Sequence, residues 1–174
     1  MNFQLYCIII LMVELSTISI GGDPAIIKLD NYILREIGTL SRCIHTISDT
    51  KFKELNLQKG QFIFLTRVCE NPGINQIDLS NLLKVDKTTT TKAIQKLIAT
   101  GYIRKTRDDL DKRMWRLYAE KKGLEIYPLV IEEENRNIAV CFTNFTEEEK
   151  ESVQQLVKKM RQNIENKWKI LKNV

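Results

Sequence analysis

Apolar residues follow helical spacing along most of the chain, and the single segment that departs from it is the feature that most restricts the fold. Between residues 33 and 99, and again from 122 to 171, apolar residues recur every three or four positions, which predicts amphipathic helices. From Tyr102 to Ala119 they alternate with polar residues instead, and the turn-forming stretch Asp108–Asp111 divides this segment in two. The pattern predicts a mainly α-helical protein with a small β-hairpin.

Capping residues mark where the helices begin and end. Side chains of Asp, Asn and Thr satisfy the free N–H groups of a first helical turn, and an acid three residues later strengthens the signal. The expected helix starts lie at Asp30 or Asn31, at Asn75 with Asp78, at Asp86, and at Thr146 with Glu149. Pro72–Gly73 and Gly101 are expected helix ends. A short helix, a turn and a second short helix therefore precede the hairpin.

Positive charge is concentrated in one part of the chain. The net charge of the whole sequence is +5 and its pI is about 9.0. Residues 84–116 contain ten Lys or Arg against four Asp, a net charge of +6, so the remainder is close to neutral. A confined basic segment is typical of proteins that contact the phosphates of nucleic acids, whereas an ordinary solvated surface mixes both signs.

The helix expected over residues 87–99 carries four consecutive threonines, which are poor helix formers. Ile94, Leu97 and Ile98 are expected to mark its buried side, with Thr90 pointing inward one turn earlier. The open face then carries Thr88, Thr89, Thr91, Lys92 and Gln95. A helix that keeps these threonines is expected to use their hydroxyl and methyl groups.

A short helix, a turn, a polar helix and a basic hairpin follow one another in a winged helix-turn-helix. In that fold the second helix enters the major groove, and the hairpin reaches an adjacent groove or the backbone. The expected fold is therefore a winged helix-turn-helix flanked by N- and C-terminal dimerisation helices. Its expected segments are an apolar arm (1–28), a dimerisation helix (29–56), the DNA-binding region (57–120) and C-terminal dimerisation helices (121–174).

At this point the sequence resembles the MarR family of bacterial regulators, named for multiple antibiotic resistance. The resemblance extends from about Leu29 to Leu171, and its most specific parts are Pro72–Leu79, Val85–Lys92, Gly101–Ile103, and Asp111–Arg113 followed by Gly123. It implies a two-fold dimer on a palindromic operator, with an effector between the dimer region and the DNA-reading lobes. The chain departs from the family at Tyr118–Glu120, where Leu-Thr is usual before the closing Lys-x-Gly, which alters the cap of the next helix.

The expected DNA contacts come from the second helix and the hairpin. They are Lys87, Thr88, Thr89, Thr91, Lys92 and Gln95 of the helix, and Arg107, Asp111, Lys112 and Arg113 of the hairpin. Arg113 is expected to reach a narrow minor groove, and Asp111 to hold its guanidinium in a fork of hydrogen bonds. Trp115 alternates with Leu117 and is expected to lie in the core of the hairpin.

The resulting functional hypothesis is a sequence-specific transcriptional regulator, in the first place a repressor, that acts as a homodimer on double-stranded operator DNA. Release by a small aromatic or anionic effector is a further expectation, with Arg42 and His45 as candidate contacts. Two alternatives remain open: a redox-sensing regulator that uses Cys43, and a helical interaction module without DNA binding. By resemblance, the peroxide-sensing branch places its cysteine early in the first long helix, where this chain has Ile33 and Leu34.

Other classes of function lack the residues they need. One histidine and four widely separated cysteines, Cys7, Cys43, Cys69 and Cys141, form no metal-binding spacing, and each cysteine is expected to pack as a small apolar residue. No nucleophile–base pair or phosphate-binding loop is present, so neither an enzyme nor a cofactor is expected. The apolar run Leu5–Val13 is shorter than the roughly 20 residues that span a bilayer and follows no basic segment. We expect a cytoplasmic protein without a membrane partner.

Overall fold

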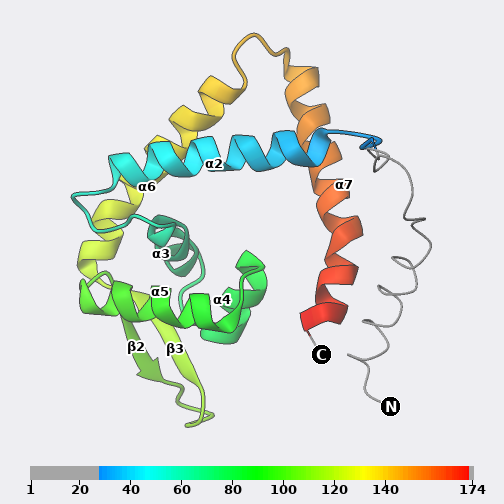
Figure 1. Cartoon of the computed structure of the whole chain (residues 1–174). Helices are drawn as coiled ribbons and strands as arrows, with labels where there is room; N and C mark the ends of the chain where they lie inside the picture. Colours follow the sequence, from blue (N-terminus) through cyan, green and yellow to red (C-terminus); the bar gives the residue numbers. More distant parts are fainter. Residues whose placement is uncertain (1–27, 173–174) are drawn as a thin grey trace, which may run out of the picture. The chain divides into compact units, whose positions relative to one another are not determined.

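The computed structural model describes residues 28–172 and contains, within them, six helices and three short strands. In chain order these are α2 (Ile33–Lys51), α3 (Gln61–Glu70), β1 (Ile74–Asn75), α4 (Gln76–Leu83), α5 (Lys87–Ala99), β2 (Ile103–Arg107), β3 (Trp115–Ala119), α6 (Lys121–Cys141) and α7 (Glu147–Lys172) (Figure 1). This confirms a mainly helical fold with a small wing. The expected apolar arm lies almost wholly outside the described residues.

Two units divide the chain, one ending at Thr39 and the other running from Leu40 onward. In the first unit, the Asn31 side chain accepts a hydrogen bond from the N–H of Ile33 at 2.8 Å. Asn31, of the two expected candidates, therefore caps the start of α2. The remainder of α2, from Leu40 onward, and all later elements belong to the second unit.

The expected caps form in the second unit. Asn75 accepts the N–H of Asp78 at 2.9 Å at the start of α4, and Asp86 accepts the N–H of Thr89 at 2.7 Å at the start of α5. At α7, Thr146 and Glu149 form a reciprocal capping box, in which each side chain accepts the other residue's backbone N–H at 3.2 Å and 2.8 Å, respectively. These bonds fix where the helices begin.

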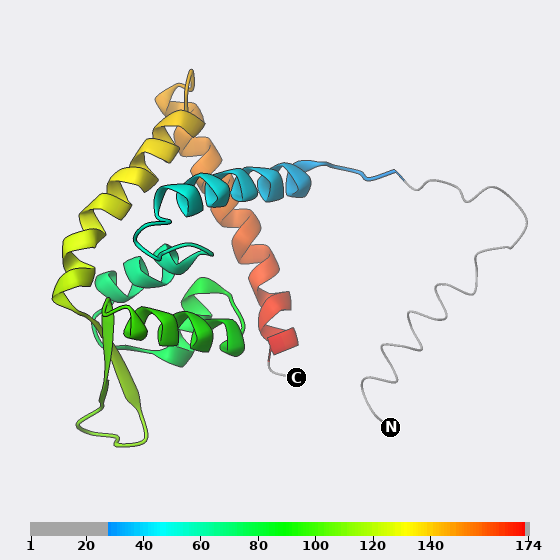
Figure 2. The same cartoon turned by 60° about the vertical axis from the view of Figure 1, so that its left-hand side comes forward.

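The three strands form one antiparallel sheet in the order β1-β3-β2. In the β2–β3 hairpin, which confirms the expected wing, Lys105 lies opposite Leu117. The two-residue strand β1, which the sequence pattern did not reveal, pairs Ile74 with Leu117 and so ties the turn before α4 to the wing. The outer end of the hairpin projects away from α3, α4 and α5 in both views (Figures 1 and 2).

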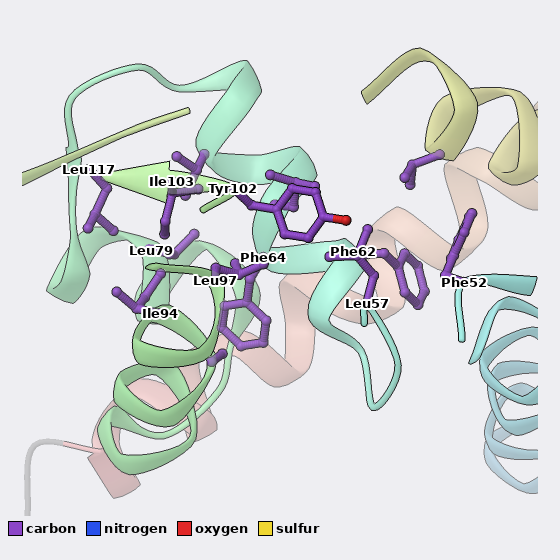
Figure 3. Close-up of a cluster of buried hydrophobic side chains, with 14 residues drawn as sticks. Phe52, Leu57, Phe62, Phe64, Leu79, Ile94, Leu97, Tyr102, Ile103 and Leu117 are labelled. Atoms are coloured by element: carbon purple, nitrogen blue, oxygen red, sulfur yellow. The ribbon is translucent and has the colours of Figure 1, made fainter. Parts of the chain in front are cut away.

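The buried core joins α3, α4 and α5 to the inner end of the wing and to α6. Its fully buried side chains include Leu57, Leu65, Val68, Leu79, Leu97, Tyr102, Ile103, Leu117 and Val130 (Figure 3). Ile94 and Leu97 lie on the buried side of α5 as expected, but Ile98 is 38% exposed. That expectation was wrong because Ile98 lies in the last turn of α5, one position beyond the row that meets the core.

Tyr102 and Gly123 form the junction between the wing and α6. The Tyr102 ring is buried and its hydroxyl donates to the carbonyl of Leu55 at 2.8 Å, while its own carbonyl accepts the N–H of Glu120 at 2.9 Å. A Cβ atom on Gly123 would lie only 2.3 Å from the Tyr102 carbonyl oxygen. Glu120 gives α6 no side-chain cap, which agrees with the expected departure at this position.

We predict that Gly123→Ala destabilises the protein, although alanine is the better helix former by about 1 kcal/mol. The added Cβ would meet backbone, which cannot swing aside as a side chain can, and such overpacking costs about 1–3 kcal/mol. A urea denaturation series should show a lower midpoint for Gly123→Ala and little change for Lys121→Ala, two positions earlier on the exposed surface. An increase in the midpoint for Gly123→Ala would contradict the close contact.

Candidate nucleic-acid interface

The outward face of α5 presents side chains that are free to contact a ligand. Lys87, Thr88, Lys92 and Gln95 are exposed, and their side chains form no hydrogen bond or ion pair with any described residue. Two cations and two uncharged polar groups thus share one face of a rigid helix. Such a face offers charge to phosphates and hydrogen-bonding groups to base edges.

The other threonines of α5 use their hydroxyl groups within the protein. Thr89 donates to the Asp86 carboxylate at 2.6 Å, and this bond lowers the pKa of Asp86. Thr90 is buried, as expected, and donates to the Asp86 carbonyl at 3.0 Å. Thr91 donates to the Lys87 carbonyl at 2.8 Å and also accepts a bond from Gln76. Thr89 and Thr91 can therefore offer mainly methyl groups to a ligand.

At the wing tip, Asp111 holds the guanidinium of Arg113. The Asp111 carboxylate accepts Nε of Arg113 at 3.2 Å and Nη2 at 3.5 Å, and it also accepts the Arg113 backbone N–H at 3.0 Å. The Arg113 side chain is 93% exposed. So exposed a pair adds little to stability. Its consequence is that a protruding cation has a fixed direction.

Asp108 organises the turn that carries this pair, a role that sequence reasoning missed because it treated Asp108 only as a turn former. Its carboxylate accepts the backbone N–H groups of Leu110 and Asp111 at 2.8 and 2.9 Å, and Nε of Arg116 at 2.5 Å. Arg116 in turn donates to the carbonyl of Gly73 at 3.2 Å. The bond from Asp111 and the contact with Arg116 lower the pKa of Asp108 to about 2.

The outer end of the hairpin holds a cluster of cations around Trp115. The Nζ of Lys105 and the guanidinium of Arg107 lie 5.0 and 4.9 Å from the centre of its ring, and Arg107 also donates to the Lys112 carbonyl at 2.8 Å. Trp115 is 38% exposed, so its expected place in the core is wrong. Trp115 pairs with Arg107 at the outer end of the sheet, where the body of the protein no longer lies beneath it.

The candidate effector contacts Arg42 and His45 are both exposed on α2, one turn apart. The Nδ1 atom of His45 donates to the carbonyl of Ser41 at 2.8 Å, and its ring centre lies 6.3 Å from that of Phe62. These contacts hold the imidazole beside Phe62, within the second unit. The arrangement leaves one cation and one aromatic ring at the surface.

The described cysteines differ from the expected core packing. Cys43 and Cys141 are exposed, and only Cys69 is partly buried, where burial raises the pKa of its thiol to about 11. The first two positions lie on helix faces that a single chain leaves uncovered. Within residues 28–172, no three His, Cys, Asp or Glu side chains are grouped to hold a metal ion. In the same range, no helix combines the length and apolar character needed to cross a membrane.

The chain is similar to known proteins of one family. Residues 55–114 match the model of the MarR family. The chain is 42% identical over 142 residues to YybA of Bacillus subtilis, an uncharacterized HTH-type transcriptional regulator, in a match covering 82% of this chain and 95% of that protein. A MarR protein structure from Peptoclostridium difficile is 60% identical, with a TM-score of 0.81, covering 87% of this chain and 99% of the other.

A further solved structure contains nucleic acid. It is a MarR family transcriptional regulator from Listeria monocytogenes complexed with a 26mer DNA. That protein is 41% identical to this chain, with a TM-score of 0.79, and the match covers 84% of this chain and 96% of the other.

We predict that Asp108→Ala loosens the wing turn. The amides of Leu110 and Asp111 would lose their acceptor, so their hydrogen exchange should speed up, whereas exchange in α5 should not change. Asp109→Ala is the matched control, because the fully exposed Asp109 carboxylate lies only near Lys112 Nζ, at 3.5 Å. Since the pKa of Asp108 is about 2, below its unfolded value of about 3.9, the protection should persist at pH 5 and fade as the pH falls through about 2. Equal exchange rates in both variants would contradict this role.

Proposed function

The chain belongs to the MarR family of transcriptional regulators, and from this premise we propose that it represses transcription as a homodimer bound to a palindromic operator. Membership makes the chain a regulator rather than an enzyme. The observation that carries the proposal is the combination of the open α5 face with the outward, aimed guanidinium of Arg113. The DNA complex of the Listeria monocytogenes relative supports it.

In this proposal α5 enters the major groove. Lys87 and Lys92 contact phosphates, which gives affinity without sequence preference. Gln95 offers its amide to base edges, while the threonine methyls contact the methyl groups of thymine. Arg113 enters the adjacent minor groove, where a weakly hydrated and permanently charged guanidinium suits the strongly negative potential. Arg107 and Lys112 add positive charge beside it.

The dimer is proposed from apolar surface that a single chain leaves exposed. Val140 of α6 is 73% exposed, and Leu156 and Ile164 of α7 are 61% and 60% exposed. Leu40 and Ile47 of α2 are each 50% exposed. Monomeric proteins rarely expose apolar patches of this kind, and a two-fold dimer buries the same patch on both chains. Two α5 helices related by two-fold symmetry would read a palindrome.

Repression and effector release complete the proposal. A dimer seated on a promoter blocks transcription by occupancy, without any further domain. We place a small aromatic or anionic effector near Arg42 and His45, because a guanidinium and an aromatic ring one turn apart match the charge and the flat shape of such a ligand.

The proposed function is tested by selecting DNA with the full-length protein from a pool of random duplexes and sequencing what is bound. We expect an inverted repeat with half-sites about one helical turn apart, roughly 10 base pairs. Enrichment of no motif would contradict sequence-specific binding, and a motif without internal symmetry would contradict the two-fold dimer.

We predict that Arg113→Ala weakens binding to the selected duplex at least about tenfold and makes the plot of log affinity against log salt shallower by about one contact. The melting temperature should hardly change, because the side chain is almost fully exposed. Fluorescence anisotropy across a salt series and a thermal melt measure both quantities.

Two further variants sharpen this test. Asp111→Ala should weaken binding less, because Arg113 remains but its guanidinium is no longer held by the Asp111 carboxylate. Arg113→Lys keeps the positive charge but cannot form the paired guanidinium hydrogen bonds with Asp111. The slope of log affinity against log salt should therefore match that of the wild type, while the affinity falls. A drop in stability for Arg113→Ala, with intact affinity per folded dimer, would make the wing assignment wrong.

We predict that Leu156→Asp disrupts the dimer, because a carboxylate would be buried where the apolar faces of two chains meet. Sedimentation at micromolar concentration should show monomer or aggregate for this variant. Gln162→Asp on the polar side of α7 should remain dimeric. A folded, soluble wild-type monomer at the same concentration would contradict the proposed assembly.

A further inference from the structure

The turn between α4 and α5 fixes the direction of the Lys84 side chain. Lys84 ends α4 in a left-handed conformation, with φ of 57°. Ser80 secures the turn from both sides, because its carbonyl accepts the N–H of Val85 at 3.2 Å and its hydroxyl donates to the Val85 carbonyl at 2.7 Å. Lys84 therefore projects from the rigid segment that leads directly into α5, the recognition helix of the proposed function.

The ammonium group of Lys84 meets the far end of α7. Its Nζ lies 2.6 Å from the Glu165 carboxylate and 5.0 Å from the centre of the Trp168 ring. Glu165 is only 17% exposed and is also paired with Arg161 at 2.7 Å. In both views the last turns of α7 lie opposite α4 and the start of α5 (Figures 1 and 2).

This contact extends to the first residues of the recognition helix. Trp168 and Leu171 of α7, together with Val85, Asp86 and Lys87, line a hollow of roughly 430 Å³. The start of α5 is thus attached to α7, while the end of α5 is attached to α6 through Tyr102 and Gly123. With one attachment alone, α5 could still rotate relative to the rest of the protein. The second attachment, at the other end of α5, fixes the angle of this helix.

We propose that Lys84, Glu165 and Trp168 form a strut between α7 and the turn before α5 that sets which half-site spacing the dimer accepts. The inference rests on the proposed function, since spacing has meaning only for two α5 helices on one duplex. α7 carries the apolar surface proposed for the dimer, so the strut relates the recognition helix to the dimer axis. These three residues position α5 and do not touch DNA.

The charges make this role separable from a phosphate contact. Lys84 belongs to the basic segment, yet its charge is balanced by Glu165, and its side chain is only 32% exposed. Removing the negative charge of Glu165 should, by electrostatics alone, strengthen binding to DNA. The strut predicts the opposite, because the recognition helix would lose its fixed angle.

The experiment uses the full-length protein and the duplex selected above, together with duplexes that have one base pair inserted or removed at the centre. If the DNA-competent angle falls to about a tenth of the population, Glu165→Gln and Lys84→Gln should each bind the selected duplex about tenfold more weakly. Both should lose less on the altered spacings, so that the preference for one spacing flattens. Lys84→Arg, which keeps the ion pair and the ring contact, should retain the wild-type preference.

Matched controls on α7 are Glu148→Gln and Lys167→Gln, which change the same charges at exposed positions without a side-chain partner among the described residues. They should keep the wild-type spacing preference. A second readout needs no DNA: exchange of the Val85 amide should speed up in Glu165→Gln but not in Glu148→Gln.

Several results would overturn the strut. Unchanged hydrogen exchange of the Val85 amide in Glu165→Gln would show that the contact between Lys84 and Glu165 does not stabilise the turn before α5. Tighter DNA binding by Glu165→Gln would show that the Glu165 carboxylate affects binding only by repelling the DNA phosphates. An equal loss on all spacings, with a shallower salt slope for Lys84→Gln, would make Lys84 a phosphate contact. If the wild-type protein selects no motif, the proposed function fails, whatever the exchange data show.

Discussion

The burial of Tyr102 is the constraint on which the arrangement of α5, the wing and α6 depends. Its N–H donates to the Leu97 carbonyl near the end of α5, its carbonyl accepts the N–H of Glu120 before α6, and its hydroxyl bonds to Leu55. One residue thus fixes the end of α5, the wing and the start of α6 against each other. Gly123 makes this possible, because any Cβ there would collide with the Tyr102 carbonyl. At this junction backbone meets backbone, and backbone atoms cannot move aside as a side chain can. The junction is therefore rigid.

The acidic residues of the basic segment organise its positive charge. Asp86 caps α5 by accepting the N–H of Thr89, Asp108 closes the wing turn, and Asp111 aims Arg113. Each carboxylate is engaged by backbone or side-chain donors, so it is less available to repel a polyanion than a free acid would be. Segment 84–116 therefore gains local order from its acids while keeping a net charge of +6 from ten bases and four acids.

Sequence patterns predicted the features that depend on near neighbours. The cap at Asp86 and the hairpin are local, and the family resemblance carried the order of elements. The short strand that contains Ile74 could not be predicted, because its pairing with Leu117 depends on residues far along the chain. Alternation placed Trp115 on one face of its strand but could not show that the core ends before it. The contact of Lys84 with α7 likewise joins distant segments.

The four threonines of α5 illustrate how a poor local propensity can serve a surface. Hydroxyl groups normally compete with a helix by bonding to its backbone elsewhere. Here Thr90 and Thr91 donate to carbonyls four residues earlier, and Thr89 donates to the Asp86 side chain, so the competing groups support the helix start instead. Their stiff, branched side chains then hold the methyl groups of Thr89 and Thr91 in fixed directions. Under the proposed function, such a surface is preorganised to meet thymine methyls, because ordering it costs little additional entropy when DNA binds.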